Sequence, residues 1–243
     1  MDIKVFLNGP YNGATLDTTL ITTPAVRAIM DAAYCDTSTI GDPTGFLPVT
    51  AVMDTALGTA PVPNSAVDVI MVELRDGTDA VVDVSYAWLM FDGSVRDFAT
   101  ATTSYVQFCA AGDASYRVVV KHRNHISIQS ATAANAYDRN VPAVLDLTAP
   151  GNVYEGGDIV NTMMRNGGTI RMAAGNAYPN VSGFDQGECN ASDFFVVSTE
   201  NDASPINVYN NADLNMNGVV NASDFTIVDT NSLNLYYASF PNP

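Results

Sequence analysis

The sequence predicts a mainly β protein, in which an antiparallel β-sandwich is followed by a small module of two loop-helix units. Three observations lead to this prediction. β-branched and aromatic runs separated by short turns fill the middle of the chain, and helical periodicity is weak until near residue 190. After about residue 172 the composition shifts to Asn, Gly, Asp and Ser. We therefore expect a β-sandwich domain over 1–172 and a C-terminal module over 173–243.

The N-terminal elements are short. IKVFLNGPYNG, 3–13, begins as a β-rich run and stops at turn residues, which predicts a strand entering turns. TTPAVRAIMDAAYC, 22–35, predicts a short helix that begins at Thr23 with Pro24 as its first residue.

The central runs predict the strands of the core. VDVIMVELRD (67–76), VVDVSYAWLMF (81–91) and YRVVVKHRNHISI (116–128) are rich in β-branched and aromatic residues and are bounded by turn residues. RDGTD at 75–79 and the Asp-Gly pair at 92–93 predict tight turns between strands.

The charge of the chain excludes some partners. Ten Lys and Arg stand against 26 Asp and Glu, for a formal net charge of −16. Such a chain is repelled by phosphate backbones and anionic lipid surfaces, so neither nucleic acid nor a membrane surface is expected as a partner. No apolar run reaches about 18 residues, so membrane insertion is not expected. Bound divalent cations would offset part of the self-repulsion of the folded chain.

The stretch DLNMNGVVNASDF, which starts at Asp213, matches the spacing of an EF-hand-type calcium loop. Such a loop supplies oxygens from positions 1, 3, 5, 7, 9 and 12 and has glycine at position 6, where the chain turns sharply. Gly218 occupies position 6. Asn side chains and a final Asp in place of Glu predict micromolar or weaker affinity. The expected Ca²⁺ ligands are Asp213, Asn215, Asn217, the carbonyl of Val219, Asn221 and Asp224.

This loop has a partial copy upstream. CNASDFFVVSTEN (189–201) and VNASDFTIVDTNS (220–232) match at an offset of 31 residues, and each predicts a short helix capped by Ser192 or Ser223. Phe184 would fall on a ligand position of an ordinary loop ending at Asp193. A loop enlarged by insertion is the alternative. It would bind a second calcium through Asn176, Asn180, Asp185, Asn190 and Asp193.

The loop, the NASDF repeat and the helix after each copy resemble a dockerin-type calcium module, over roughly 175–235. The resemblance implies two loop-helix units packed face to face. Dockerins dock onto a cohesin partner, but FFVVSTEN and FTIVDTNS show no paired recognition signature.

The front of the chain carries a second resemblance. VFLNGPYNGATLDTTL (5–20), VDVIMVELRD and YRVVVKHRNHISI are similar to a module of large secreted bacterial proteins sorted by type IX secretion. The closing SFPNP resembles the start of a type IX sorting domain. This resemblance implies an extracellular, calcium-rich setting and no enzymatic activity.

The two histidines, His122 and His125, raise the question of zinc. Residues three apart on one strand point to opposite faces, so a shared metal would need a break in the strand. We expect structural roles instead, with Arg123 and Asn124 tying this strand to a neighbouring loop by hydrogen bonds.

Other chemistry-bearing residues predict structure rather than a reaction. Trp88 has apolar neighbours and is expected in the core, and Glu73 is expected in a salt bridge or at a strand end. The sequence has no nucleophile elbow, no Cys-His pair in a recognisable context and no phosphate loop. The cysteines allow one disulfide with one free thiol, or three reduced thiols: Cys35, Cys109 and Cys189.

Together these features predict a non-catalytic, secreted or cell-surface calcium-binding structural protein that serves adhesion, matrix or filament assembly. Self-association is expected through strand addition, with IKVFL as an isolated strand for another subunit's sheet edge. Another surface protein is an alternative partner. The alternative function is that of an accessory module that binds glycan or protein for a larger secreted enzyme.

Overall fold

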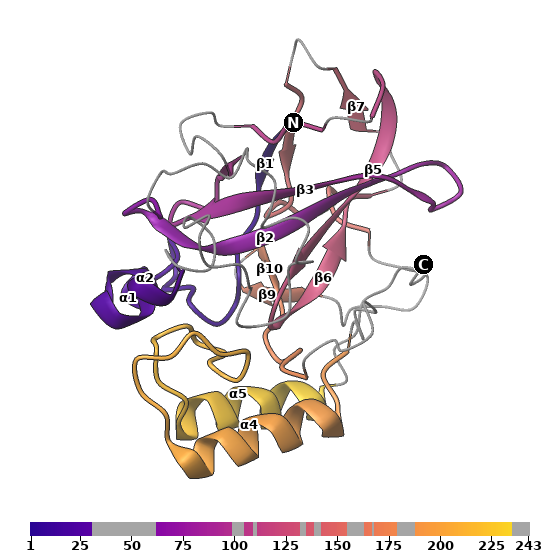
Figure 1. The fold of residues 1–243 in the computed structure, drawn as a ribbon. Coiled ribbons are helices and arrows are strands. Elements are labelled where there is room, and N and C mark those ends of the chain that lie inside the picture. Colours follow the sequence, from indigo (N-terminus) through magenta and orange to yellow (C-terminus); the bar gives the residue numbers. More distant parts are fainter. Residues whose placement is uncertain are drawn as a thin grey trace.

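The protein is mainly β, as expected from its sequence (Figure 1). The computed structural model describes residues 1–30, 62–98, 105–108, 111–131, 135–138, 142–154, 163–166, 168–178 and 188–234. Six strands form one antiparallel sheet: β2 (Ala66–Arg75), β3 (Val81–Met90), β4 (Val95–Asp97), β5 (Ala114–His122), β6 (His125–Gln129) and β7 (Asn135–Tyr137). The order is β4-β3-β2-β5-β6, and β7 pairs with the start of β5.

A second layer packs against this sheet. It contains β1 (Asp2–Lys4), β8 (Val144–Asp146), β9 (Met163–Asn166) and β10 (Thr169–Met172). β1 pairs with β8 in parallel, and β9 pairs with β10 in antiparallel. After β1, the N-terminal segment continues beside β10, and the Met172 amide donates to the Phe6 carbonyl at 2.8 Å. The N-terminal segment is therefore already paired within its own chain, and the expectation of an isolated strand for another subunit is wrong.

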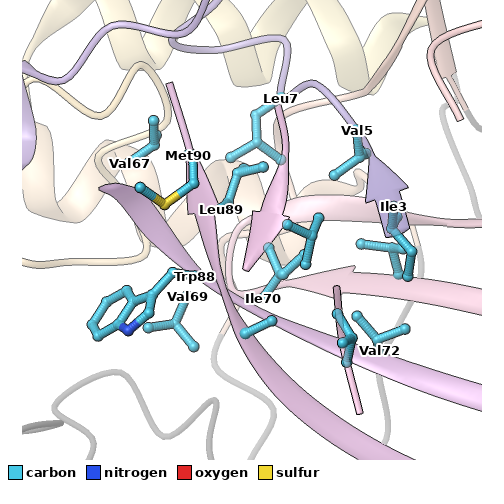
Figure 2. Close-up of a cluster of buried hydrophobic side chains, with 14 of the residues drawn as sticks. Ile3, Val5, Leu7, Val67, Val69, Ile70, Val72, Trp88, Leu89 and Met90 are labelled. Carbon is cyan, nitrogen blue, oxygen red and sulfur yellow. The ribbon is translucent and has the colours of Figure 1, made fainter. Parts of the chain in front are cut away.

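The core lies between the two layers (Figure 2). Ile3, Val5 and Leu7 alternate toward it from the N-terminal segment and meet the side chains of β2 and β3. β2 is buried along its whole length except at Met71, and the buried residues include the charged Asp68, Glu73 and Arg75. Trp88 is 2% exposed and stacks on Phe98, which confirms the expected core position.

The predicted turns and the predicted N-terminal helix are present. The Met90 amide donates to the Ser94 carbonyl across the Asp92-Gly93 turn, where Gly93 has a φ of +82°. The Asp76 amide donates to the Ala80 carbonyl across the second turn. Helix α2 spans Pro24–Met30, and residues 31–35 of the helix expected at 22–35 lie outside the described residues. A further short helix, α1 at Thr19–Thr22, was not expected.

The run 116–128 is a hairpin rather than one strand. β5 ends at His122 and β6 begins at His125, so Arg123 and Asn124 form the turn between two paired residues. The sequence does not mark this turn with glycine or proline, and β-branched residues before and after it favour one continuous strand.

Two helices follow in the C-terminal part, α4 (Ala191–Ala203) and α5 (Ala222–Leu233), and they lie side by side below the sheet (Figure 1). Their Phe194 and Phe225 rings are 4.9 Å apart, and Val197 and Val228 are fully buried. None of the helices in the described ranges is long and apolar enough to cross a bilayer.

The helix caps differ from the expected ones. Asn190 caps α4 and Asn221 caps α5, because each Asn side chain accepts the amide two residues on, from Ser192 or Ser223. In both helices an Asp at the third helical position completes a capping box, which orients the preceding loop toward the helix.

Candidate metal centre

The segment Asp213–Asp224 folds into a closed coil whose last three residues form the start of α5. Asp213 is fully buried, and its two carboxylate oxygens accept the amides of Asn217 at 3.0 Å and Gly218 at 2.8 Å. The chain thus wraps around the Asp213 carboxylate within five residues. This is the local geometry that a loop needs in order to gather oxygen ligands about one point.

Gly218 sits where the coil reverses direction, with a φ of +80°. A residue with a side chain would be strained there, since the left-handed region favours glycine. A Cβ on Gly218 would make only an ordinary van der Waals contact, at 3.4 Å from the Val26 side chain, so crowding does not exclude a larger residue. The glycine expected at position 6 of the loop therefore has a conformational reason to be there.

Asp224 closes the loop from its other end. Its Oδ1 accepts the amides of Leu214 at 2.8 Å and Asn215 at 3.1 Å, and its Oδ2 accepts the amide of Asn221 at 3.0 Å. The carboxylate is fully buried. Positions 1 and 12 of the expected loop are thus brought together by bonds that run from the helix back to the loop's start.

The asparagines between them brace the coil. Asn215 Oδ1 accepts the Asn217 amide at 3.1 Å, and Asn217 Oδ1 accepts the Val219 amide at 2.9 Å. Asn221 Oδ1 accepts both the amide and the hydroxyl of Ser223, as the cap of α5. Val219 also bridges to Ile206, which ties the loop to the segment after α4.

Burial dominates the electrostatics of the two carboxylates. It raises the pKa of Asp213 to about 7. Arg123 and the Gly218 amide partly offset this rise, and the nearby Asp224 charge adds to it. Burial also raises the pKa of Asp224, against the hydrogen bonds from the loop amides. A cation held between these two carboxylates would offset the cost of ionising them in a buried site.

The donor set fits a hard cation. Carboxylate and amide oxygens are the ligands that calcium prefers, at about 2.3–2.6 Å and in sets of about six to eight. Within the described ranges, no three His, Cys, Asp or Glu side chains come together as a metal cluster. The loop brings two carboxylates together, so its amide side chains and carbonyls would have to complete the coordination.

The upstream unit repeats the same closure. Asp193 is fully buried, and it accepts the amides of Tyr178 at 2.8 Å and Asn190 at 2.9 Å. Burial raises its pKa to about 6. Tyr178 thus corresponds to Asn215, and Asn176, two residues earlier, corresponds to Asp213.

This correspondence matches the register of the enlarged loop. The stretch from Asn176 to Asp193 is six residues longer than the stretch from Asp213 to Asp224. Asn176 is buried, and Asn190 caps α4 while its side chain also donates to Glu188. Asn180 and Asp185 lie outside the described residues, so the structure places only three of the five ligands expected there.

Both units are anchored by the β5–β6 turn, which sequence reasoning only partly foresaw. Arg123 donates to the Asn210 carbonyl, and Asn124 Nδ2 donates to the carbonyls of Asn211 at 3.2 Å and Asp213 at 2.8 Å. The expected ties from Arg123 and Asn124 to a neighbouring loop are confirmed. The expectation that His122 and His125 point apart is wrong, because the turn lies between them and places their Nδ1 atoms 3.0 Å apart.

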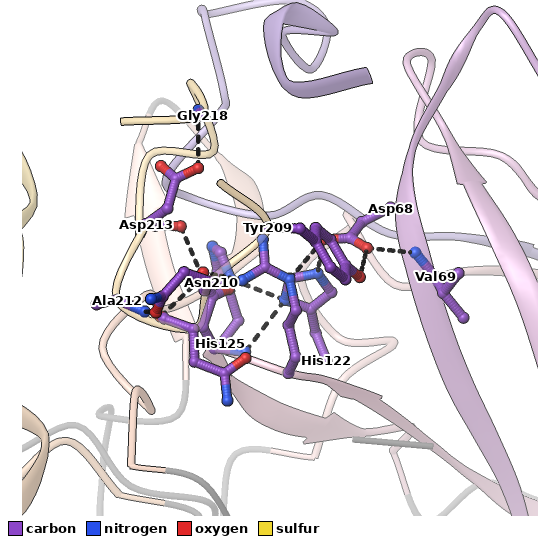
Figure 3. Close-up of polar contacts among 12 residues, drawn as sticks. Asp68, Val69, His122, His125, Tyr209, Asn210, Ala212, Asp213 and Gly218 are labelled. Atoms are coloured by element: carbon purple, nitrogen blue, oxygen red, sulfur yellow. Dashed lines mark hydrogen bonds and ion pairs between the residues drawn. The ribbon is translucent and has the colours of Figure 1, made fainter. Parts of the chain in front are cut away.

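A buried charge network supports this turn (Figure 3). Asp68 on β2 pairs with Arg123 Nε at 2.8 Å and with His122 Nε2 at 3.1 Å, and it also accepts the Tyr209 hydroxyl. Burial alone would raise the pKa of Asp68, but these partners outweigh it and hold the pKa below its usual value. Burial lowers the pKa of His122 and, more strongly, that of His125. Both rings are therefore uncharged at neutral pH, and they are linked to each other and to Asp68 and Asn124 by hydrogen bonds.

The remaining candidate residues are structural where they are described. Glu73 is buried and pairs with Lys121 at 2.9 Å and Arg75 at 2.6 Å, which confirms the expected salt bridge. Cys189 is a buried free thiol whose pKa burial raises to about 12. Cys35 and Cys109 lie outside the described residues.

No family model matches the chain, and none of the curated proteins does. A solved structure that matches is a mutant type II cohesin–X-dockerin complex from Acetivibrio cellulolyticus, at 18% identity and a TM-score of 0.35. The match covers 68% of this chain and 83% of that one. At this TM-score the overlap is too loose to define a shared fold, and the link to type IX secretion stays a prediction.

Proposed function

We propose that this chain is a non-catalytic, extracellular structural protein whose C-terminal part is held to a β-sandwich by bound calcium. The observation that carries the proposal is the closure of one loop by two buried carboxylates, Asp213 and Asp224. Their burial raises both pKa values, and calcium bound between them would offset the cost of ionising them. Asn215, Asn217, Asn221 and the Val219 carbonyl would complete the site.

The ion would act as a staple rather than a switch. Calcium joined to both ends of the loop would stabilise the coil and the start of α5 at once. A ligand that binds only the folded state at 100 times its dissociation constant adds about 2.7 kcal/mol to the free energy of unfolding. The second site is proposed with the same chemistry from Asn176, Asn190 and Asp193, together with Asn180 and Asp185.

Isothermal titration with calcium, combined with melting in calcium and in EGTA, tests this proposal. Wild type is expected to bind calcium and to melt at a higher temperature in its presence. Asp213→Ala and Asp224→Ala should each remove most of that calcium-dependent shift. Asp229→Ala, which removes an exposed carboxylate from α5, is the matched control and should retain the shift. The absence of any shift in wild type would refute the calcium site.

The second part of the proposal is an assembly role in adhesion, matrix or filaments, which rests on the net charge of −16 and on the proposed calcium sites. The N-terminal segment does not supply the contact, because it is paired between β8 and β10. Light scattering and electron microscopy, each with and without calcium, test this role. Monomers under both conditions would refute it. Trp88 offers no stacking platform for a glycan, because it is buried.

A further inference from the structure

Asn124 stands at the meeting point of the two loop-helix units. It is fully buried at the tip of the β5–β6 hairpin. Its backbone carbonyl accepts the amides of Gly175 at 3.0 Å and Asn176 at 3.2 Å, where the upstream loop begins. Its side chain donates to the Asn211 and Asp213 carbonyls, where the downstream loop begins. One residue thus holds the first positions of both loops.

The orientation of the Asn124 amide is determined by its neighbours. The Gly9 amide donates to His125 Nε2 at 3.3 Å, so the proton of the neutral His125 ring belongs on Nδ1. That Nδ1–H donates to Asn124 Oδ1 at 2.8 Å. With its oxygen engaged there, the Asn124 NH₂ group must face the two loop carbonyls.

The chain of hydrogen bonds continues into the main sheet. His122 Nδ1 faces His125 Nδ1 at 3.0 Å, and His122 Nε2 lies 3.1 Å from Asp68 Oδ2 (Figure 3). Asp68 is fully buried on β2. A rigid polar path therefore runs from the centre of the sheet through two histidines to Asn124 and the loops, and buried networks of this kind hold their members in a single arrangement.

We propose that Asn124 is a positioning residue for calcium binding, which sets the first ligand position of each loop relative to the β-sheet. This inference rests on the proposed function. Asn124 lies 89 residues before Asp213 and touches no metal in this scheme. Asn124 holds the backbone carbonyl of Asp213, and the Asp213 side chain is the first expected ligand. In other metal sites, residues that hydrogen-bond to the ligands without touching the metal orient those ligands in the same way. On this proposal the C-terminal loops are attached to the sandwich through the β5–β6 hairpin, and their calcium affinity depends on that hairpin.

Asn124→Asp is the sharpest test, because it preserves shape while replacing two donors with a carboxylate that faces two carbonyl oxygens. Calcium affinity by titration should fall at least tenfold. In EGTA, hydrogen exchange should speed up at 174–178 and 211–218 while β2 and β3 keep their protection. Asn124→Ala, which removes the donors without adding charge, should show the same pattern more weakly and is used if Asn124→Asp does not fold.

Two controls separate positioning from general destabilisation. Asn152→Asp changes an exposed turn asparagine whose Nδ2 donates to the Asp146 carbonyl at 2.8 Å, and it should leave calcium affinity unchanged. Val72→Ala lowers the melting temperature from the core of β2 without touching the loops, and it too should keep wild-type affinity.

Calcium affinity and exchange at wild-type values in both Asn124 variants would overturn the inference, and so would an equal loss of affinity in Val72→Ala. Failure of wild type to bind calcium would refute the proposed function. In that case the exchange pattern in EGTA still decides whether Asn124 positions the loops.

Discussion

Replacing Gly9 by alanine should separate the N-terminal segment from the downstream loop. A Cβ at Gly9 would overlap the carbonyl oxygen of Leu214 and lie 2.9 Å from its carbonyl carbon. Leu214 stands between Asp213 and Asn215, two expected calcium ligands. The obstacle is backbone rather than a flexible side chain, so either the loop or the N-terminal segment has to move. Movement of either would also strain the bond from the Gly9 amide to His125.

Two opposing effects determine the magnitude. Forcing an extra carbon into a packed site costs about 1–3 kcal/mol. Alanine also restricts the unfolded chain, which returns about 0.4–1 kcal/mol where the backbone tolerates it. The two ranges together span about 0–2.6 kcal/mol, and the clash with backbone favours the upper part. We therefore expect Gly9→Ala to lower the free energy of unfolding by about 1–2.6 kcal/mol, and to weaken calcium binding because the displaced carbonyl adjoins two ligand positions.

Urea unfolding in EGTA measures the first effect, and calcium titration measures the second. Gly77→Ala is the matched control, because a Cβ there would meet nothing within 4 Å. It should leave stability unchanged or raise it by about 0.4–1 kcal/mol. If Gly9→Ala is as stable as Gly77→Ala and binds calcium equally well, the packing of the N-terminal segment on the loop is not as described.

Asp68→Asn leaves the Arg123 guanidinium buried without its anionic partner. It should lower the free energy of unfolding, measured with urea, by about 3–5 kcal/mol. The control Asp202→Asn changes an exposed carboxylate and should alter that free energy by less than about 0.5 kcal/mol. A loss below about 1 kcal/mol for Asp68→Asn would contradict the buried pair. Burial holds the pKa of His125 well below 6.5, so below pH 6.5 the unfolded chain binds a proton at this ring that the folded chain does not. The stability that neutral His125 contributes to the folded protein is therefore lost as pH falls below 6.5. The stability difference between wild type and His125→Gln should therefore be constant above pH 6.5 and shrink by about 1.4 kcal/mol per pH unit below it; a pH-independent difference would show that the ring is not buried in its neutral form.

Several features were predictable because they depend on neighbours in sequence. The turns at Asp92-Gly93 and Asp76–Ala80 follow from local backbone preferences, and the helix at Pro24 follows from proline's fixed φ. The coil of the Asp213–Asp224 loop also arises within twelve residues, from side chains that accept amides a few positions away.

The features that sequence reasoning missed involve long-range contacts. No pattern in YRVVVKHRNHISI marks the turn at Arg123 and Asn124, because that turn is stabilised by residues near 175 and 211 rather than by its own turn propensity. The pairing of the histidine rings follows from that turn. The parallel pairing of β1 with β8 joins segments more than a hundred residues apart, and a strand pattern does not specify its partner.

For this protein, the sequence by itself determined the β-rich class, the position of the two helices and the register of the downstream loop, since each is encoded in periodicity or spacing over a few residues. Only the tertiary structure decided which residues hold the two expected calcium loops against the sheet. His122, Asn124 and His125 are neighbours in the β5–β6 hairpin, but their partners Asp68 and Asp213 lie 54 and 89 residues away from the hairpin residues that they contact. Each buried polar group must find its partner once water is excluded. Folding brings those groups into one path, and that path joins the expected calcium loops to the sheet.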